Sequence, residues 1–273
     1  MRQQEDQSMY APLLSPQRDA CGTGFVARLD GSASHDVLRE ALFAVSNLVH
    51  RGAVDADRKT GDGAGVMFSL PQAFFKEEYA RLSGEPAGTR RVAVGTFFLP
   101  ESGTRGYPRA KALVEEELAR RGLTAYAWRH VPMDTSVLGA KARSTLPDIE
   151  QLILMVDPWT DLHTIERRLY SLRRTLELLA TRAELPLYIA SMSCRTLSYK
   201  GLMISPILGD FYTDLTNESF ETSFAIFHQR YSTNTLPSWH LAQPFRCVAH
   251  NGEINTIGGN RRWASIRGVM RDA

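Results

Sequence analysis

Cys21-Gly22-Thr23-Gly24-Phe25 is the stretch on which the interpretation of this chain depends, because it joins a cysteine to small residues and the start of an apolar run. Residues 1–20 before it are polar, rich in Gln and without periodicity, and we predict that they form a removable leader. Cleavage after Ala20 would leave Cys21 with a thiol and a free α-amine, whose ordinary pKa values are about 8.5 and about 8. Such a residue is a nucleophile that carries its own base. The alternative is a buried structural thiol, since free cysteine is among the most buried residue types.

The composition excludes several classes of protein. The chain has 273 residues, 43% of them hydrophobic and 23% charged, which suits one large soluble domain or two small ones. Its net charge of +2 gives no electrostatic footprint for nucleic acid, and no apolar run reaches the about 20 residues that span a bilayer. The leader lacks the basic and apolar regions of a secretory signal. We therefore expect a cytoplasmic protein with neither a nucleic-acid nor a membrane partner.

The cysteines and histidines predict no metal site. The chain has three cysteines and no CxxC pair, so neither a zinc nor an iron–sulfur site is indicated, and reduced thiols fit best. Cys194 and Cys247 are expected to be buried thiols. The histidines do not have the spacing of metal ligands on a common element.

Hydrophobic periodicity predicts strands interleaved with helices, without a clear linker. Strands are expected at 21–29, 65–68, 92–99, 124–131, 151–156, 187–190, 195–199, 224–230 and 245–250. Helices are expected at 36–50, 71–82 and 107–121, from Asn260 onward, and most clearly where Ile165, Leu169, Leu172, Leu176 and Leu179 recur at intervals of four and three. Segments 82–89 and 136–148 are predicted to be loops. The pattern alone indicates a layered fold that mixes helices and strands.

Four further blocks of sequence stand in a familiar order after Cys21-Gly22. They are His50-Arg51-Gly52-Ala53, Gly61-Asp62-Gly63-Ala64-Gly65, His228-Gln229-Arg230-Tyr231-Ser232-Thr233-Asn234-Thr235 and His250-Asn251-Gly252-Glu253-Ile254-Asn255-Thr256. Together they resemble the N-terminal glutaminase domain of the glutamate synthase large subunit, a class II glutamine amidotransferase. The resemblance implies that residues 21–273 are one amidotransferase domain with an α+β fold, the four-layer αββα sandwich of N-terminal nucleophile hydrolases. The family's domain continues past this C-terminus, so we expect 21–273 to be partial, truncated before an acidic residue that holds the substrate α-amine.

The resemblance also implies the chemistry of Cys21. Its thiol attacks the side-chain carboxamide of L-glutamine, forms a γ-glutamyl thioester and releases ammonia, after which water releases glutamate. Asn251 and Gly252 are the expected oxyanion hole, in which the loss of one donor costs about 2.7–4 kcal/mol of transition-state stabilisation. The alternative for Asn251-Gly252 is an ordinary hairpin turn, which this dipeptide favours strongly.

Two arginines are candidates for binding the α-carboxylate of glutamine. Arg230 ends a predicted strand, and its planar guanidinium suits a carboxylate; the alternative is a solvated charge at a strand end. Arg51 follows a predicted helix, and its alternative role is a partner of the helix dipole. Thr233 and Asn234 either line the glutamine pocket or cap a turn. Asp62 lies in a glycine-rich loop that lacks the Lys-Ser/Thr of a phosphate loop, so we interpret that loop as scaffolding.

The resemblance sets expectations for cofactors and partners. We expect no cofactor in this part of the protein, whereas the full-length family enzyme carries FMN and an iron–sulfur cluster in other domains. The expected partners are those remaining synthase domains, which pass ammonia to 2-oxoglutarate, and a small electron-donating subunit. One alternative is a catalytically incompetent glutamine-binding or assembly fragment. Another is an amidotransferase-like subunit of a related complex, although Tyr199-Lys200-Gly201-Leu202 favours glutamate synthase.

Overall fold

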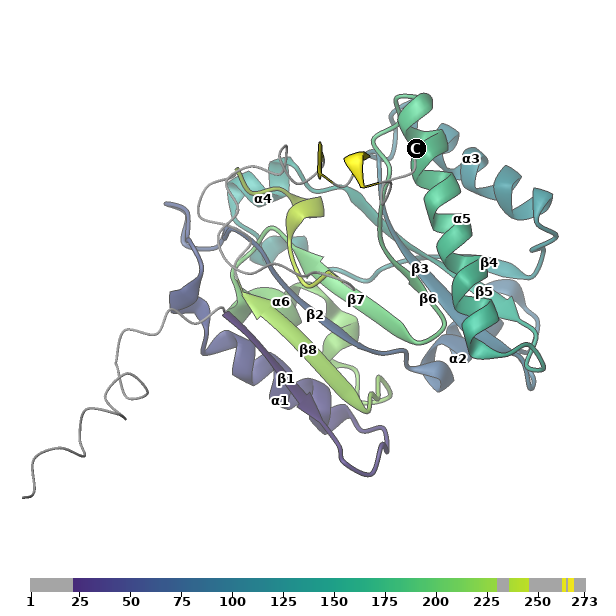
Figure 1. Ribbon diagram of the computed structural model, residues 1–273. Coiled ribbons are helices and arrows are strands. Elements are labelled where there is room, and N and C mark those ends of the chain that lie inside the picture. The colour runs from purple at the N-terminus through teal and green to yellow at the C-terminus, as the bar shows by residue number, and fades with distance from the viewer. Residues whose placement is uncertain (1–21, 230–235, 246–261, 264, 268–273) are drawn as a thin grey trace, which may run out of the picture.

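The strands form two four-stranded antiparallel sheets in the computed structural model, which describes residues 22–229, 236–245, 262–263 and 265–267 (Figure 1). In the first sheet the strand order is β1 (Gly22–Ala27), β8 (Phe224–Gln229), β2 (Ala64–Ser69) and β7 (Thr196–Gly201). In the second sheet the order is β4 (Tyr126–His130), β5 (Asp148–Val156), β3 (Arg91–Leu99) and β6 (Tyr188–Ser193). The hairpin from β6 to β7 carries the chain from the second sheet to the first.

Helices pack against both sheets. The described α-helices are α1 (His35–Ser46), α2 (Gln72–Ser83), α3 (Gly106–Arg120), α4 (Ala140–Ser144), α5 (Leu162–Arg182) and α6 (Leu208–Phe211). Short 3-10 helices occur at Val49–Arg51, Thr135–Val137, Ser205–Ile207, Thr213–Thr216 and Trp239–Leu241. Helix α1 lies against β1 and β8, and it begins after Ser34, whose hydroxyl accepts a hydrogen bond from the Asp36 amide. The structure thus confirms a fold of mixed helix and sheet.

The second sheet is covered on one face by α3 and α5, which pack against each other (Figure 1). Phe97 of β3 and Leu152 of β5 share a buried cluster with Val114 of α3 and Leu172 of α5. A separate cluster joins α1 and α2 to the first sheet and to the other face of the second sheet. Burial of these side chains is the main favourable term in the stability of such a fold.

Most predicted elements are present, and the exceptions have physical reasons. The predicted loop at 136–148 contains Thr135–Val137 and α4, each of them too short to show a periodic pattern. Strand β5 begins at Asp148 rather than at residue 151, because its buried Glu150 is bound by Lys111 of α3 at 2.9 Å. Helix α1 ends at Ser46, and a 3-10 turn follows it. The strand predicted at 245–250 lies almost wholly outside the described residues.

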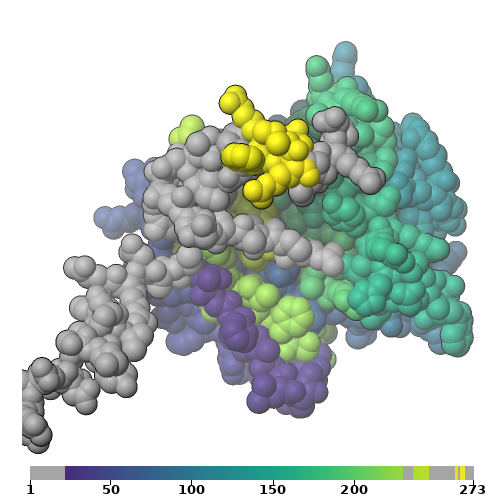
Figure 2. Space-filling view, viewed as in Figure 1, coloured from purple at the N-terminus to yellow at the C-terminus, as the bar shows by residue number. Residues whose placement is uncertain are grey.

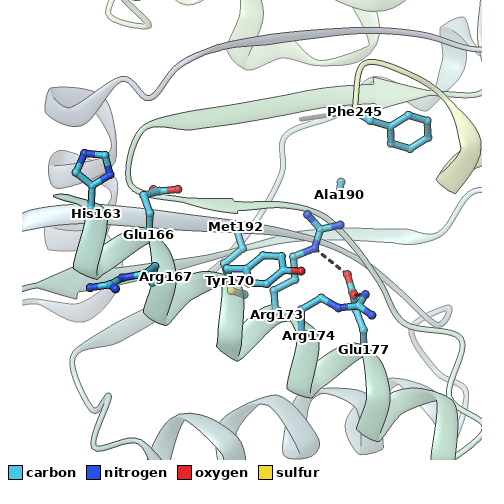
Figure 3. A pocket seen from close by; sticks show the side chains of 10 residues that line it. All are labelled: His163, Glu166, Arg167, Tyr170, Arg173, Arg174, Glu177, Ala190, Met192 and Phe245. Carbon is cyan, nitrogen blue, oxygen red and sulfur yellow. Dashed lines mark hydrogen bonds and ion pairs between the residues drawn. The ribbon is translucent and has the colours of Figure 1, made fainter. Parts of the chain in front are cut away.

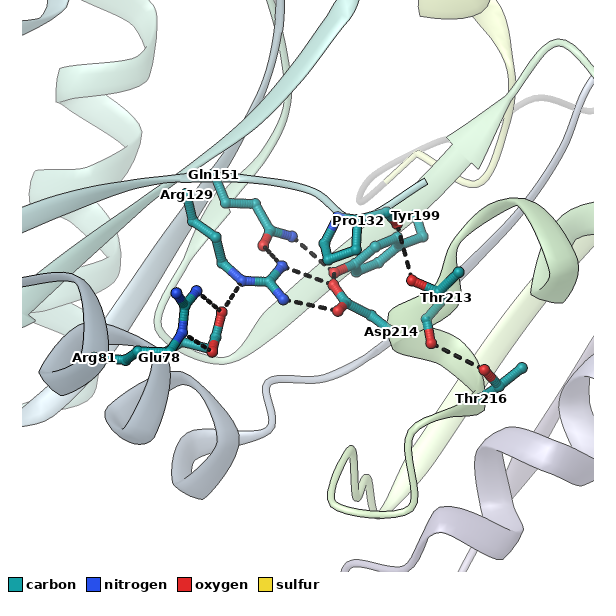
Figure 4. A network of polar contacts seen from close by, with 9 residues as sticks. All are labelled: Glu78, Arg81, Arg129, Pro132, Gln151, Tyr199, Thr213, Asp214 and Thr216. Carbon is teal, nitrogen blue, oxygen red and sulfur yellow. Dashed lines mark hydrogen bonds and ion pairs between the residues drawn. The ribbon is translucent and has the colours of Figure 1, made fainter. Parts of the chain in front are cut away.

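A buried polar network centred on Arg129 joins the two sheets (Figure 4). The Arg129 guanidinium is 4% exposed and donates to both carboxylate oxygens of Asp214 at 2.7 Å, to Gln151 at 3.0 Å and to Glu78. Tyr199 of β7 donates to Asp214 at 2.5 Å and accepts from Gln151 at 3.0 Å. Every charge in this network has a hydrogen-bonded partner of opposite sign, which is the condition under which burial of charge is tolerated.

Phe25 of β1 is at the surface, whereas Met67 and Ser198 on the same face of the first sheet are buried. Phe25 is 76% exposed, and Figure 2 shows the purple N-terminal part of the described chain on the visible side of the molecule. Among the described helices, none combines the length and apolar character that a membrane span requires.

Candidate active site

The start of β1 packs closely against two other segments. Gly22 is the register partner of Gln229, the last residue of β8. A Cβ atom added at Gly22 would lie 2.3 Å from the Gln229 carbonyl oxygen and 3.1 Å from the Arg51 Cβ. Any larger residue at position 22 would therefore have to push these neighbours away. The residue that follows Cys21 thus lies directly against Arg51.

Arg51 is the one member of the predicted site that falls within the described residues. It ends the 3-10 helix Val49–Arg51, is half-buried, and is followed by Gly52 in extended conformation. The prediction placed Arg51 near the pocket, and the packing of its side chain on Gly22 is consistent with this position. Its place in the last turn of a helix also fits the alternative role, and the two roles are compatible.

The remaining predicted site residues lie outside the described residues. These are Cys21, Arg230, Thr233, Asn234, Asn251 and Gly252. Two of them adjoin a described pair: Cys21 precedes Gly22, and Arg230 follows Gln229 in the sequence. Their roles therefore stay predictions.

A buried polar cluster of Gln229 and Asp62 adjoins Arg51; the sequence analysis interpreted Asp62 as scaffolding and assigned Gln229 no role of its own. Gln229 is fully buried, and its Oε1 accepts a hydrogen bond from the Ser205 amide at 2.8 Å. Asp62 is 4% exposed, and its Oδ1 accepts from the Ala53 amide at 3.1 Å. A Cβ atom added at Gly52 would lie 2.1 Å from Gln229 Nε2 and 3.0 Å from Asp62 Oδ1. Gly52 thus allows both polar side chains to approach the chain beside Arg51.

A sequence signal for Gln229 does exist. Along β8 the fully buried positions alternate, and they are Ala225, Phe227 and Gln229. A polar residue in that apolar series indicates a buried amide with a specific partner. Asp62 is harder to find, because acidic residues between glycines are also common in exposed turns.

Lys200 is a buried lysine on the same sheet. It is 1% exposed, and its Nζ donates to the Tyr188 hydroxyl at 2.8 Å and to the His240 carbonyl at 3.2 Å. The Phe245 ring lies 4.3 Å from the same nitrogen. Burial, together with the charge of Arg173, lowers the pKa of Lys200 to about 7. Lys200 is opposite Gly65 of β2 in the register. Its contacts with His240 and Phe245 join β7 to the segment 240–245.

A sizeable cavity among the described residues lies away from Gly22. It measures about 960 Å³ and is formed by one side of α5, by Ala190 and Met192 of β6, and by Phe245 (Figure 3). Arg173 and Arg174 of α5 both form ion pairs with Glu177, and the distance from Arg173 Nε to Glu177 Oε1 is 2.7 Å. These ion pairs offset part of the positive charge on the α5 side of the cavity. No residue of β1 or of the Arg51 segment lines it, and we do not identify it as the glutamine site.

The described thiol is unsuited to nucleophilic catalysis. Cys194 is buried as predicted, and burial together with the Glu166 carboxylate raises its pKa to about 12. Its thiolate is therefore scarce at neutral pH. In the part of the chain that the structure describes, no group of three or more His, Cys, Asp or Glu side chains is placed to hold a metal ion. Cys247 lies outside that part.

Comparisons with known proteins agree on one family. The model of the class-II glutamine amidotransferases matches residues 21–271. The chain is 44% identical over 248 residues to the glutamate synthase [NADPH] large chain of Azospirillum brasilense. It is 43% identical over 253 residues to ferredoxin-dependent glutamate synthase 1 of Arabidopsis thaliana and 40% identical over 256 residues to ferredoxin-dependent glutamate synthase 2 of Synechocystis. These alignments cover 90%, 92% and 94% of the chain but 16% of each relative, so the chain spans about a sixth of their length.

Proposed function

Because the chain belongs to the class II glutamine amidotransferases, we propose that it performs the glutaminase half-reaction of a glutamate synthase. The observation that carries this proposal is the packing of Gly22 on Arg51 and Gln229, since it sets the residue after the nucleophile against a candidate carboxylate-binding arginine. The proposal extends to the complete fold, in which the two sheets belong to a four-layer αββα sandwich.

In the proposed mechanism Cys21 becomes N-terminal when residues 1–20 are removed. Its α-amine takes the thiol proton, directly or through water, and the sulfur attacks the carboxamide carbon of glutamine. Asn251 and Gly252 stabilise the oxyanion, the carbon–nitrogen bond breaks, and the proton leaves with ammonia. Water then hydrolyses the γ-glutamyl thioester to glutamate. Arg230 and Arg51 hold the substrate α-carboxylate, and Thr233 and Asn234 line the pocket.

The wider role of the ammonia is also a proposal. The relatives are named as NADPH and ferredoxin-dependent glutamate synthases, and by analogy ammonia would go to 2-oxoglutarate in another domain. FMN and an iron–sulfur cluster would serve that second reaction. Among the described residues no group of side chains is placed to hold a metal, and Cys194 is buried among the apolar residues of α5 and β3, so these residues do not fit an iron–sulfur cluster. The other synthase domains, a small electron-donating subunit and a cytoplasmic location complete the proposal.

Alkylation by 6-diazo-5-oxonorleucine, a glutamine mimic, tests the proposed function. The protein at its natural length should show, by intact mass, loss of residues 1–20 and one adduct on Cys21. Cys21→Ala should abolish glutamine hydrolysis, because the thioester cannot form. The matched control is Cys194→Ala, which removes a buried thiol and should leave hydrolysis intact.

Two outcomes would contradict the proposed function. Unchanged hydrolysis in Cys21→Ala would exclude Cys21 as the nucleophile. A processed protein that takes up no adduct and hydrolyses no glutamine would favour the non-catalytic alternative, a glutamine-binding or assembly module.

A further inference from the structure

We propose that Gln229 is a positioning residue for glutamine binding, whose side chain holds the segment that carries Arg51 in register with the start of β1. The inference rests on the proposed function and adds a residue that acts without touching the reacting atoms. The residues that carry it are Gly22, Arg51, Gly52 and Gln229, all within the described part of the chain.

The two ends of the Gln229 carboxamide face different segments. Its Oε1 accepts a hydrogen bond from the Ser205 amide at 2.8 Å, and the Ser205 hydroxyl in turn donates to the Val45 carbonyl of α1 at 2.8 Å. Its Nε2 lies over Gly52, only 2.1 Å from where a Cβ atom would be. One side chain therefore joins the end of β8 to the start of the 205–207 turn and to the residue after Arg51.

Backbone packing extends this connection to the nucleophile strand. The Gln229 carbonyl oxygen and the Arg51 Cβ both lie close to where a Cβ atom of Gly22 would be, at 2.3 and 3.1 Å. Gly22, Arg51 and Gln229 thus meet at one corner of the first sheet. A shift in the Gln229 side chain would move the Arg51 segment relative to this corner.

The carboxamide is a poor choice for stability alone. Gln229 is fully buried, and its Nε2 has no hydrogen-bond partner among the described residues. An unsatisfied buried donor is unfavourable, so the Nε2 half of the carboxamide does not add to stability, whereas Oε1 satisfies the buried amide of Ser205. A polar side chain at this position is better explained by the segments that it holds together.

Gln229→Glu is the first test, carried out on the protein at its natural length. The change keeps the size and the acceptor for Ser205 but removes the amide donor and adds a negative charge near Asp62. We expect the KM for glutamine to rise about tenfold and kcat to change less than about threefold, because the Arg51 segment is displaced while Cys21 stays in place. The rate of alkylation by iodoacetamide, which needs only an accessible thiol, should remain within about twofold of the wild-type rate.

Gln72→Glu is the matched control. The Gln72 carboxamide also bridges backbone groups, donating to the Val92 and Cys194 carbonyls at 3.0 and 3.3 Å and accepting from the Val92 amide at 3.0 Å. It lies at the start of α2, away from Gly22. A purely structural role for Gln229 predicts the same KM in the two variants, and that result would overturn the inference.

A second pair of variants keeps the test valid if Gln229→Glu does not fold. Gly52→Ala should impair glutamine binding, because its methyl group would collide with Gln229 Nε2. Gln229→Ala shortens the side chain and removes this collision. The double variant Gly52→Ala/Gln229→Ala should therefore fold better than Gly52→Ala alone, yet keep a raised KM for glutamine. Recovery of the wild-type KM in the double variant would overturn the inference. Absence of glutamine hydrolysis in the wild-type protein would instead overturn the proposed function itself.

Discussion

The network around Arg129 and the cluster around Gln229 both bury polar side chains, but they use different kinds of polar group. The Arg129 network pairs full charges through side chains: Arg129 donates hydrogen bonds to Asp214 and Glu78, and also to the neutral Gln151. The Gln229 cluster uses a neutral amide, the Asp62 carboxylate held by a backbone amide, and glycines. The first lies between the two sheets, and the second lies at the corner where β1 begins.

The difference indicates what each region is for. Paired buried charges tolerate almost no displacement, because moving one partner leaves the other without compensation. A neutral amide beside glycines leaves space for backbone segments to approach each other and a ligand. The Arg129 network therefore secures the scaffold, whereas the role proposed for the Gln229 cluster is to position the segment that carries Arg51.

The largest effect on stability is expected from Asp214→Asn. This change removes the carboxylate that holds Arg129 in a bidentate pair and should lower the free energy of unfolding by about 3–5 kcal/mol. Urea denaturation monitored by fluorescence measures it. The KM of the folded fraction for glutamine should stay close to the wild-type value, in contrast to Gln229→Glu. A loss below about 1 kcal/mol would remove the distinction between scaffold and site.

A smaller and pH-dependent effect is expected from Lys200→Met. The pKa of Lys200 is about 7 in the folded chain and higher in the unfolded chain. At a pH between these two pKa values, Lys200 is protonated in the unfolded chain and neutral in the folded chain. Wild-type stability should therefore rise, relative to the variant, by about 1–2 kcal/mol between pH 7 and pH 9.

The surroundings of Lys200 support this direction. Burial raises the pKa of Tyr188 to about 12, so this hydrogen-bond partner of Lys200 keeps its proton between pH 7 and pH 9. Burial and then Lys200 lower the pKa of His240, which is therefore neutral there. A difference in stability that does not change between pH 7 and pH 9 would show that Lys200 is not the titrating group.

The smallest effect is expected from Arg39→Ala. Arg39 pairs with Asp36 at 2.7 Å on α1, but both side chains are more than half exposed. Solvent screening limits such a pair to less than about 0.5 kcal/mol, which denaturation in low and high salt can measure. A loss comparable to that of Asp214→Asn would mean that burial does not govern these ion pairs.

Much of the scaffold could be predicted from local sequence. The apolar spacing from Ile165 to Leu179 predicts α5, and the apolar run at 92–99 predicts β3, because each pattern is contained in one element. The resemblance placed Arg51 among the candidate site residues, and the structure shows it packed against Gly22, while its role stays a prediction. These predictions depend on neighbours in the sequence or on a whole family pattern.

The Gln229 cluster could not be predicted in the same way. Its geometry depends on the register of β1 with β8 and on the approach of Gly52, which local patterns do not contain. Burial of Glu150 likewise depends on Lys111 from another helix. Interactions between distant segments, rather than weak propensities, account for what the sequence analysis missed.

The pairing of β1 with β8 has a consequence for synthesis. Thr23 donates to the Phe227 carbonyl across 204 residues of sequence. At roughly 5–20 residues per second, the first strand waits roughly 10–40 seconds for its partner to leave the ribosome. Among the described strands, β1 lies at the edge of its sheet and pairs with β8 alone. The segment that follows Cys21 is therefore the last part of its sheet to be completed, although it is made first.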